Sequence, residues 1–491
     1  MKNKVMLITY PDCMGNNLKD LKRMLDMYFA EAISGVHILP FFPSSGDRGF
    51  APINYKQVEP DFGDWGDIKE LAKDYELMFD FMVNHISARS SYYQDFLEKK
   101  DNSLYADLFI RYKNFWTNGN PSKTQENKIY KRKEKAPYTI AHFQDGSCEK
   151  VWCTFSEEQI DLNVSSQIGK KYLEENIQGL IEKGASLIRL DAFAYAVKKE
   201  DTNCFFVEPE IWELLSECQR MAREKGSDIL PEIHEHYSIA LKLAERGYWV
   251  YDFALPMLVL HALYFGITKY LKHWLEICPR NQYTTLDTHD GIGVVDVRGL
   301  LPDTEIERTR EHLFQYGANV KRIYSTEKYN NLDIYQINCT YYSALGDDDA
   351  AYLLARVTQL FAPGIPQIYY VGLLAGKNDT KLLEETKEGR NINRHYYTTE
   401  ELGREVERPV VKKLLKLMKL RNNEDAFNGK FSLEEPKGGH LDLCWSTEKE
   451  KIEQIMKERN FQLSRRQVQH FRYFLIAKRR SIKNYENSGL I

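Results

Sequence analysis

The sequence predicts a (β/α)8 barrel, because eight short apolar runs alternate with longer segments along most of its 491 residues. Several of the intervening segments repeat apolar residues with helical spacing, as expected for crossovers between parallel strands. Acidic residues follow three of the runs, and catalytic side chains of such barrels lie at strand ends. A doubly wound open sheet is the alternative, but no Gly-x-Gly-x-x-Gly follows the first run.

The elements are expected in a regular order. The eight strand candidates are Val5–Tyr10, Gly35–Pro40, Met78–Val83, Leu187–Asp191, Ile229–Ile233, Trp249–Phe253, Tyr283–Leu286 and Gln367–Tyr370. Helical spacing predicts helices over Leu18–Ile33, Ile68–Leu77, Ile168–Lys183 and Glu210–Lys225.

Two intervals between strands are too long for simple loops and predict inserted subdomains. Residues 84–165 form the first, after strand three, and residues 291–346 the smaller second, after strand seven. The barrel would then comprise 1–83, 166–290 and 347–430, with a small C-terminal domain over 431–491.

That C-terminal domain begins with a β pattern, whereas residues 451–491 hold ten Lys or Arg against three Glu. A solvated basic helix or a small cap on the barrel is expected there, with a nucleic-acid or membrane-surface arm as the alternative.

Composition excludes several classes of protein. A net charge of −4 and a pI near 6.4 give no general attraction to nucleic acid or to an anionic membrane. No window is long and apolar enough for a membrane span, and the first apolar run is too short for a secretion signal. The eight cysteines are scattered without a Cys-x-x-Cys pair, which indicates reduced thiols in a cytoplasmic protein.

Three carboxylates are the candidate catalytic residues: Asp191, Glu232 and Asp290. Each follows an apolar run, so the barrel would gather them at one mouth. A nucleophile must be ionised, an acid must hold its proton, and a third anion can stabilise a cationic transition state. The trio therefore suits cleavage of a bond to a sugar. Arg189, two residues before Asp191 on the same strand face, is expected to hold the pKa of Asp191 low.

Four segments carry a resemblance to a known superfamily: Met82–His85, Ile188–Asp191, Pro231–His234 and Thr288–Asp290. They resemble the α-amylase superfamily of retaining glycosidases and transglycosidases. Longer stretches resemble the sucrose phosphorylases within it, over about residues 1–430. These stretches are Gly35–Phe50, Tyr251–Pro256, Asp287–Gly293, Tyr335–Asn338, Thr340–Leu345 and Gly389–Tyr397.

The resemblance implies a role for each carboxylate. Asp191 would attack C1 of a glucosyl unit, Glu232 would serve as general acid and base, and Asp290 would stabilise the transition state. Retention implies nucleophile and acid carboxyl groups about 5–5.5 Å apart. Residues implied to hold the glucose ring are Asp47, Phe50, His85, Arg189, His289 and Arg390. Phe155, Gln159 and Tyr195 would form the wall around it, and Asp333, Tyr335 and Gln336 a mobile loop serving fructose or phosphate.

The implied reaction is reversible phosphorolysis of sucrose to α-D-glucose 1-phosphate and D-fructose. Its partners are sucrose and inorganic phosphate; no cofactor and no metal are expected, and a homodimer is left open. Phosphate needs a cation, and the run Tyr130–Lys135 offers Arg132 or Lys133. The nearest alternative is phosphorolysis of sucrose 6′-phosphate. An α-glucoside hydrolase and a non-catalytic sugar-binding homologue are the further alternatives.

Overall fold

The computed structural model describes residues 2–132, 135–318, 336–434, 440–447, 450–457 and 475–479. Eight parallel strands form one sheet in the order β10-β11-β14-β1-β2-β3-β8-β9. Its two outer strands, β9 and β10, also lie against each other, so that the sheet nearly closes. The predicted (β/α)8 barrel is therefore confirmed. The strands are β1 (Met6–Thr9), β2 (Gly35–Ile38), β3 (Glu76–Met82), β8 (Ala185–Asp191), β9 (Asp228–Pro231), β10 (Val250–Asp252), β11 (Gln282–Thr284) and β14 (Ile365–Tyr369).

The barrel has a packed interior. Large apolar side chains from most of its strands meet in one buried cluster, as expected when inward-facing residues fill a barrel of eight strands. This interior layer consists of Met6, Met78, Leu187, Leu230, Tyr251, Phe253, Tyr283 and Ile365. The interior is thereby closed below the mouth, and chemistry is confined to the carboxyl ends of the strands.

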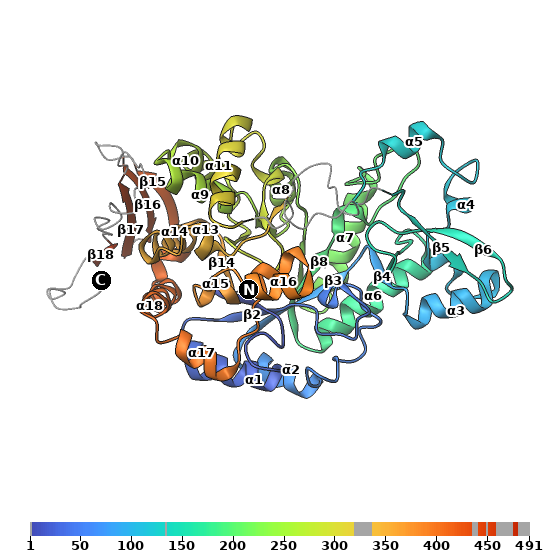
Figure 1. Ribbon diagram of the computed structural model, residues 1–491, viewed down its shortest axis with the longest axis horizontal. Helices are drawn as coiled ribbons and strands as arrows, with labels where there is room; N and C mark the ends of the chain where they lie inside the picture. The colour runs from blue at the N-terminus through green and yellow to red at the C-terminus, as the bar shows by residue number, and fades with distance from the viewer. Residues whose placement is uncertain are drawn as a thin grey trace.

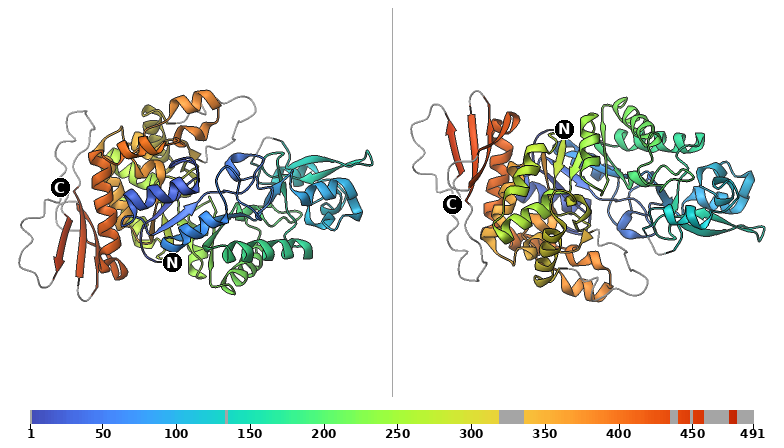
Figure 2. Two further views of the ribbon diagram at one scale, coloured as in Figure 1. Left: turned by 90° about the horizontal axis from the view of Figure 1, so that it is seen from below. Right: turned by 90° about the horizontal axis from the view of Figure 1, so that it is seen from above.

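Helices between the strands surround the barrel (Figures 1 and 2). The predicted helix Ile68–Leu77 is wrong at its end, because α2 ends at Asp74 and Leu77 already pairs in β3. The predicted helix Leu18–Ile33 likewise ends early, at Phe29, after its second half widens into a π-helix. The main helices are α1 (Leu18–Met24), α2 (Trp65–Asp74), α6 (Gln167–Glu182), α7 (Glu210–Arg223), α8 (Ser238–Glu245), α9 (Leu255–Phe265), α10 (Lys269–Ile277), α14 (Asp349–Phe361) and α18 (Pro409–Asn423).

The segment after β3 projects from one side of the barrel (Figure 1). Its first and last strands, β4 and β7, pair antiparallel, which places His85 beside Asp161 and Ser87 beside Gln159. This pairing brings both ends of the projecting segment back to the barrel. Its elements are β4 (His85–Ser87), α3 (Ser91–Lys99), α4 (Tyr112–Phe115), α5 (Lys123–Lys128), β5 (Tyr138–His142), β6 (Cys148–Trp152) and β7 (Gln159–Asp161).

The segment after β11 folds back on itself through a short antiparallel pair, in which Gly293 lies opposite Gln336. A Cβ at Gly293 would lie 2.1 Å from an oxygen of Asp296, so only glycine allows this carboxylate its place. The elements here are β12 (Ile292–Gly293), α11 (Asp303–Gln315), β13 (Gln336–Ile337) and α13 (Tyr341–Ala344).

After β14 the chain forms α15 (Tyr370–Leu373), α16 (Thr380–Thr386), a 3-10 turn (Gly389–Asn393) and α17 (Thr399–Glu405). A four-stranded antiparallel sheet follows on the side opposite the projecting segment (Figure 2). It is made of β15 (Lys430–Glu434), β16 (His440–Ser446), β17 (Glu450–Lys457) and β18 (Leu475–Arg479).

A solvated basic helix or a small cap on the barrel was expected over 451–491; the described parts of that segment, in β17 and β18, are paired strands and not a helix. The rest of the basic segment, 458–474 and 480–491, lies outside the described residues. Trp445 donates from its indole nitrogen to the carbonyl of Phe361 at 2.7 Å, which fixes the sheet to α14. No helix in the described part of the chain combines the length and apolarity needed to cross a bilayer.

Candidate active site

Three carboxylates lie at one mouth of the barrel. Asp191 is the last residue of β8, Glu232 follows the end of β9, and Asp290 lies in the loop after β11. Because all three strands are parallel, these positions share one end of the sheet. The side chains are 14%, 12% and 11% exposed, so they are largely desolvated yet still reachable by a small molecule.

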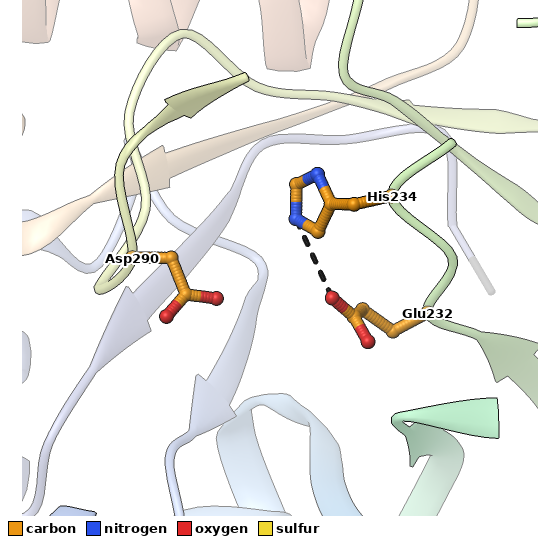
Figure 3. A group of neighbouring side chains, drawn as sticks. All are labelled: Glu232, His234 and Asp290. Atoms are coloured by element: carbon orange, nitrogen blue, oxygen red, sulfur yellow. Dashed lines mark ion pairs between the residues drawn. The ribbon is translucent and has the colours of Figure 1, made fainter. Parts of the chain in front are cut away.

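Glu232 and Asp290 point their carboxylates toward each other, with His234 beside Glu232 (Figure 3). One ligand atom from each of these three residues lies within 4.8 Å of the others. His234 Nε2 lies 3.4 Å from Glu232 Oε1. Among the described residues, these three could hold a metal ion between them.

Arg189 joins the nucleophile candidate to the acid candidate. Its Nη1 donates to Asp191 Oδ1 at 2.8 Å, and its Nη2 lies 3.8 Å from Glu232 Oε1. The backbone N–H of Ala192 donates to Glu232 Oε2 at 3.1 Å. One guanidinium therefore faces both carboxylates, and a second donor fixes the orientation of Glu232.

The expected low pKa of Asp191 is wrong. Burial raises the pKa of this carboxyl to about 8; Arg189 lowers it, and the negative charge of Glu232 raises it again. Near neutral pH the Asp191–Glu232 pair thus holds one proton. Attack on a sugar requires that proton on Glu232, so substrate binding must favour the form in which Asp191 is ionised.

Asp290 is held ionised. Burial opposes the charge, but Arg390 and then His289 keep the pKa of Asp290 well below its usual range. Arg390 Nη1 lies 3.1 Å from Asp290 Oδ1 and 3.8 Å from Asp47 Oδ1. Arg390 thereby places Asp47 at the same mouth, although the two sequence positions are far apart.

Two neutral histidines form part of the wall. Phe50 stacks on His289 with ring centres 5.0 Å apart and planes 6° from parallel. His85 Nε2 lies 2.8 Å from the carbonyl of Phe50, and the Gln159 amide donates to that same carbonyl at 3.0 Å. Burial lowers the pKa of His85 and lowers that of His289 to about 3. Both rings are therefore uncharged, and a neutral imidazole has a single N–H, which His85 donates to the Phe50 carbonyl.

Aromatic rings continue this wall toward the projecting segment. Phe155 meets His85 edge to face at 5.4 Å and Tyr195 at 5.2 Å. The guanidinium of Arg132 lies 5.8 Å from the centre of the Tyr195 ring. The other candidate phosphate ligand, Lys133, lies outside the described residues.

The predicted loop is only partly described. Gln336 lies 3.1 Å from His234, with its Nε2 facing the imidazole Nε2, which brings it next to Glu232. Asp333 and Tyr335 lie outside the described residues.

Known proteins resemble this chain closely. Residues 17–246 match the catalytic domain of the α-amylase family. A sucrose phosphorylase of Streptococcus mutans is 58% identical over 436 residues, 88% of this chain and 91% of that protein. A sucrose 6(F)-phosphate phosphorylase of Thermoanaerobacterium thermosaccharolyticum is 48% identical over 91% of this chain and 93% of its own. The crystal structure of a sucrose 6F-phosphate phosphorylase from Thermoanaerobacter thermosaccharolyticum superposes with a TM-score of 0.89, at 46% identity and 93% coverage of both chains.

The chain belongs to the sucrose phosphorylase family of the α-amylase superfamily. It is accordingly an enzyme, a glycosyltransferase of the disaccharide phosphorylase kind. The resemblance seen in the sequence motifs is confirmed over most of the chain.

Three contacts in this family member were not predicted. Asp296 faces His234 Nδ1 at 3.4 Å, and although burial lowers the pKa of His234, Asp296 and then Glu232 raise it above its usual value. Asn393 donates to the backbone carbonyl of Asp290 at 2.9 Å, within the stretch Gly389–Tyr397 that carried the resemblance. The third contact joins Asp80 to Arg189. The only sign of this contact in the sequence was an acidic residue, Asp80, inside an apolar strand.

Because catalysis needs the proton on the Asp191–Glu232 pair, we expect the phosphorylase activity to fall above a limiting alkaline pH. Because the pKa of Asp191 is raised to about 8, the proton is present below that pH and is lost above it. We expect kcat/KM for sucrose to fall about tenfold per pH unit above the limit. Initial rates across the range, with return to neutral pH as a control for inactivation, measure this. A profile that stays flat about two units above the limit would contradict it.

Proposed function

We propose that the chain catalyses reversible phosphorolysis of sucrose to α-D-glucose 1-phosphate and D-fructose, with retention at C1. The identity of 58% to a sucrose phosphorylase, over nearly the whole of both chains, is the observation that supports this substrate. The gathering of three carboxylates at one barrel mouth supports the retaining mechanism.

In the first half-reaction, Asp191 attacks C1 of the glucosyl unit through Oδ2, since Oδ1 accepts from Arg189. The bond from C1 to the fructosyl oxygen breaks, and Glu232 gives its proton to that oxygen. In the second half-reaction, a phosphate oxygen attacks C1, Asp191 leaves as carboxylate, and Glu232 takes the proton of the incoming phosphate. Two inversions at C1 conserve the α configuration.

Asp290 would stabilise the positive charge that develops on the sugar ring between these steps. It is ionised and lies within reach of the acid candidate. Arg390 and Asp47 beside it, with the neutral rings of His85 and His289, would bind the hydroxyls of the glucose unit. Phe50, Phe155, Gln159 and Tyr195 would complete its wall.

Phosphate must enter a site lined with carboxylates, so a cation has to offset the repulsion. Within the described part of the chain, Arg132 is the candidate for this cation. Its guanidinium lies over the ring of Tyr195, one of the residues proposed to form the wall around the sugar. Lys131 and Lys135 line the same small pocket as Arg132 and Tyr195, which adds positive charge there.

Phosphorolysis of sucrose 6′-phosphate is the second candidate. A protein named for that reaction is 48% identical, and the cluster of Lys131, Arg132 and Lys135 could supply the extra cationic contact that a second phosphate needs. This function is less favoured, because the identity to that protein is ten percentage points lower than the identity to the sucrose phosphorylase.

Incubation of the pure protein with phosphate and either sugar separates these functions. We expect α-D-glucose 1-phosphate from sucrose at a rate at least as high as from sucrose 6′-phosphate. A preference of about tenfold or more for the phosphorylated sugar would overturn this choice, since that factor is about 1.4 kcal/mol of transition-state binding. Free glucose as the main product, with ample phosphate, would instead identify a hydrolase.

We also propose a division into a barrel, inserts over 84–165 and 291–346, and a domain over 431–491; the positions of the helices and strands outside the barrel support it. The eight cysteines are free thiols, which supports work in the cytoplasm. A homodimer is open to measurement by light scattering.

A further inference from the structure

A row of three buried charged or titratable side chains crosses the barrel beneath the catalytic carboxylates. His37 on β2, Asp80 on β3 and Arg189 on β8 are 1%, 0% and 3% exposed. These strands are neighbours in the sheet, and their other side chains are mostly apolar. The mechanism above uses Arg189 but assigns nothing to His37 or Asp80.

The geometry of the row is tightly defined. Asp80 and Arg189 are direct partners in the register of β3 and β8. One nitrogen, Arg189 Nη1, donates to Asp80 Oδ1 and also to Asp191 Oδ1. The other oxygen of Asp80 lies 2.7 Å from His37 Nε2. The Gln367 amide faces the second imidazole nitrogen at 3.5 Å, which assigns the His37 proton to the nitrogen facing Asp80.

A role in stability alone does not account for this row. Apolar side chains of similar volume often stabilise a core at least as well as a buried ion pair does. At one end of the row, the Arg189 guanidinium that contacts Asp80 also contacts the carboxylate of Asp191. The row therefore bears directly on the proposed nucleophile.

We propose that Asp80, oriented by His37, is a positioning residue that aims Arg189 at Asp191. Asp80 also neutralises part of the positive charge of Arg189. The inference rests on the proposed function. An unshared guanidinium would hold Asp191 as a weakly basic, weakly nucleophilic carboxylate. With its charge divided between Asp80 and Asp191, Arg189 still orients the nucleophile without disabling it.

The charges around the row agree with this division. Asp80 itself is ionised: burial opposes its charge, but His37 and Arg189 lower its pKa to about 2. The negative charge of Asp80 in turn helps keep the proton on the Asp191–Glu232 pair. The groups that face the row from the packed elements are Asp191, Glu232, Tyr251, His289 and Tyr55.

The test replaces Asp80→Asn. We expect kcat on sucrose to fall about 10²-fold, with KM changed less than about threefold, because attack and not binding is impaired. The alkaline limit should move to lower pH by about one unit, because removing a negative charge makes the pair lose its proton more easily. α-D-Glucosyl fluoride, whose leaving group needs no acid, should show the same loss, which separates a defect in attack from a defect in proton donation.

Two further variants complete the test. Asp252→Asn is the matched control: Asp252 is another fully buried acid at a strand end, bonded to Trp274 at 3.0 Å, and its loss should leave the alkaline limit in place. His37→Phe removes the donor behind Asp80 and should move the limit the opposite way, to higher pH. If Asp80→Asn does not fold, His37→Phe carries the test.

The proposal is overturned if folded Asp80→Asn keeps kcat within about threefold of the wild type, or if the limit moves no more than in Asp252→Asn. It is also overturned if His37→Phe leaves the limit unmoved. All rates are relative to the wild type on the same glucosyl donor. An inactive wild type on sucrose would instead reject the proposed function, and the fluoride comparison would still decide the role of Asp80.

Discussion

Replacing Asp191→Asn is expected to lower kcat for sucrose phosphorolysis by ~10⁴-fold or more, because an amide cannot form the glucosyl ester. Binding should survive, since Arg189 and the wall residues around the sugar remain. Stopped-time assays of glucose 1-phosphate, with calorimetric titration of a glucoside, measure both effects.

Asp228→Asn is the matched control for this loss. Asp228 lies at the opposite, amino end of β9 from Glu232 and pairs with Arg223 at 3.1 Å. Acids at that end of a barrel serve stability and not catalysis. Its replacement should leave kcat within about twofold. Comparable losses in both variants would mean that Asp191 acts through folding, and would remove it as the nucleophile.

Replacing Glu232→Gln is expected to lower kcat on sucrose by ~10³-fold or more, because fructose is a poor leaving group without a proton donor. The amide oxygen can still accept from the Ala192 N–H, so the site should keep its shape. The variant should retain much of its attack on α-D-glucosyl fluoride, whose departure needs no acid.

The contrast between the two donors is the informative result. A loss of equal size on sucrose and on the fluoride would show that Glu232 does not act as the acid. Turnover of sucrose at the wild-type rate would reject any catalytic role for it.

The barrel was predictable because each strand carries its own local signal. Apolar runs such as Leu187–Asp191 end at a polar or charged residue, and the segments between successive runs are long enough for helices. The boundary at Glu76 and Leu77 was missed because both residues fit a helical pattern as well as the start of β3. Pairing with β2, a contact distant in sequence, decides the boundary in favour of the strand.

The site was less predictable, because its electrostatics depend on neighbouring strands. The spacing of Arg189 and Asp191 correctly indicated their ion pair but gave the wrong direction for the pKa of Asp191. The sequence shows neither the burial of that carboxyl nor the share of Arg189 that Asp80 takes from β3. Contacts of this kind join residues more than a hundred positions apart, and no local pattern reveals them.

The roles of Asp191 and Glu232 can be tested directly by trapping the glucosyl-enzyme intermediate. The Glu232→Gln variant should react with α-D-glucosyl fluoride and accumulate a covalent glucosyl-enzyme, because neither water nor phosphate is then activated by a base. Digestion and mass spectrometry should locate one added glucosyl unit on the peptide that contains Asp191. A glucosyl unit on any other residue, or fluoride release without a covalent adduct, would contradict the account.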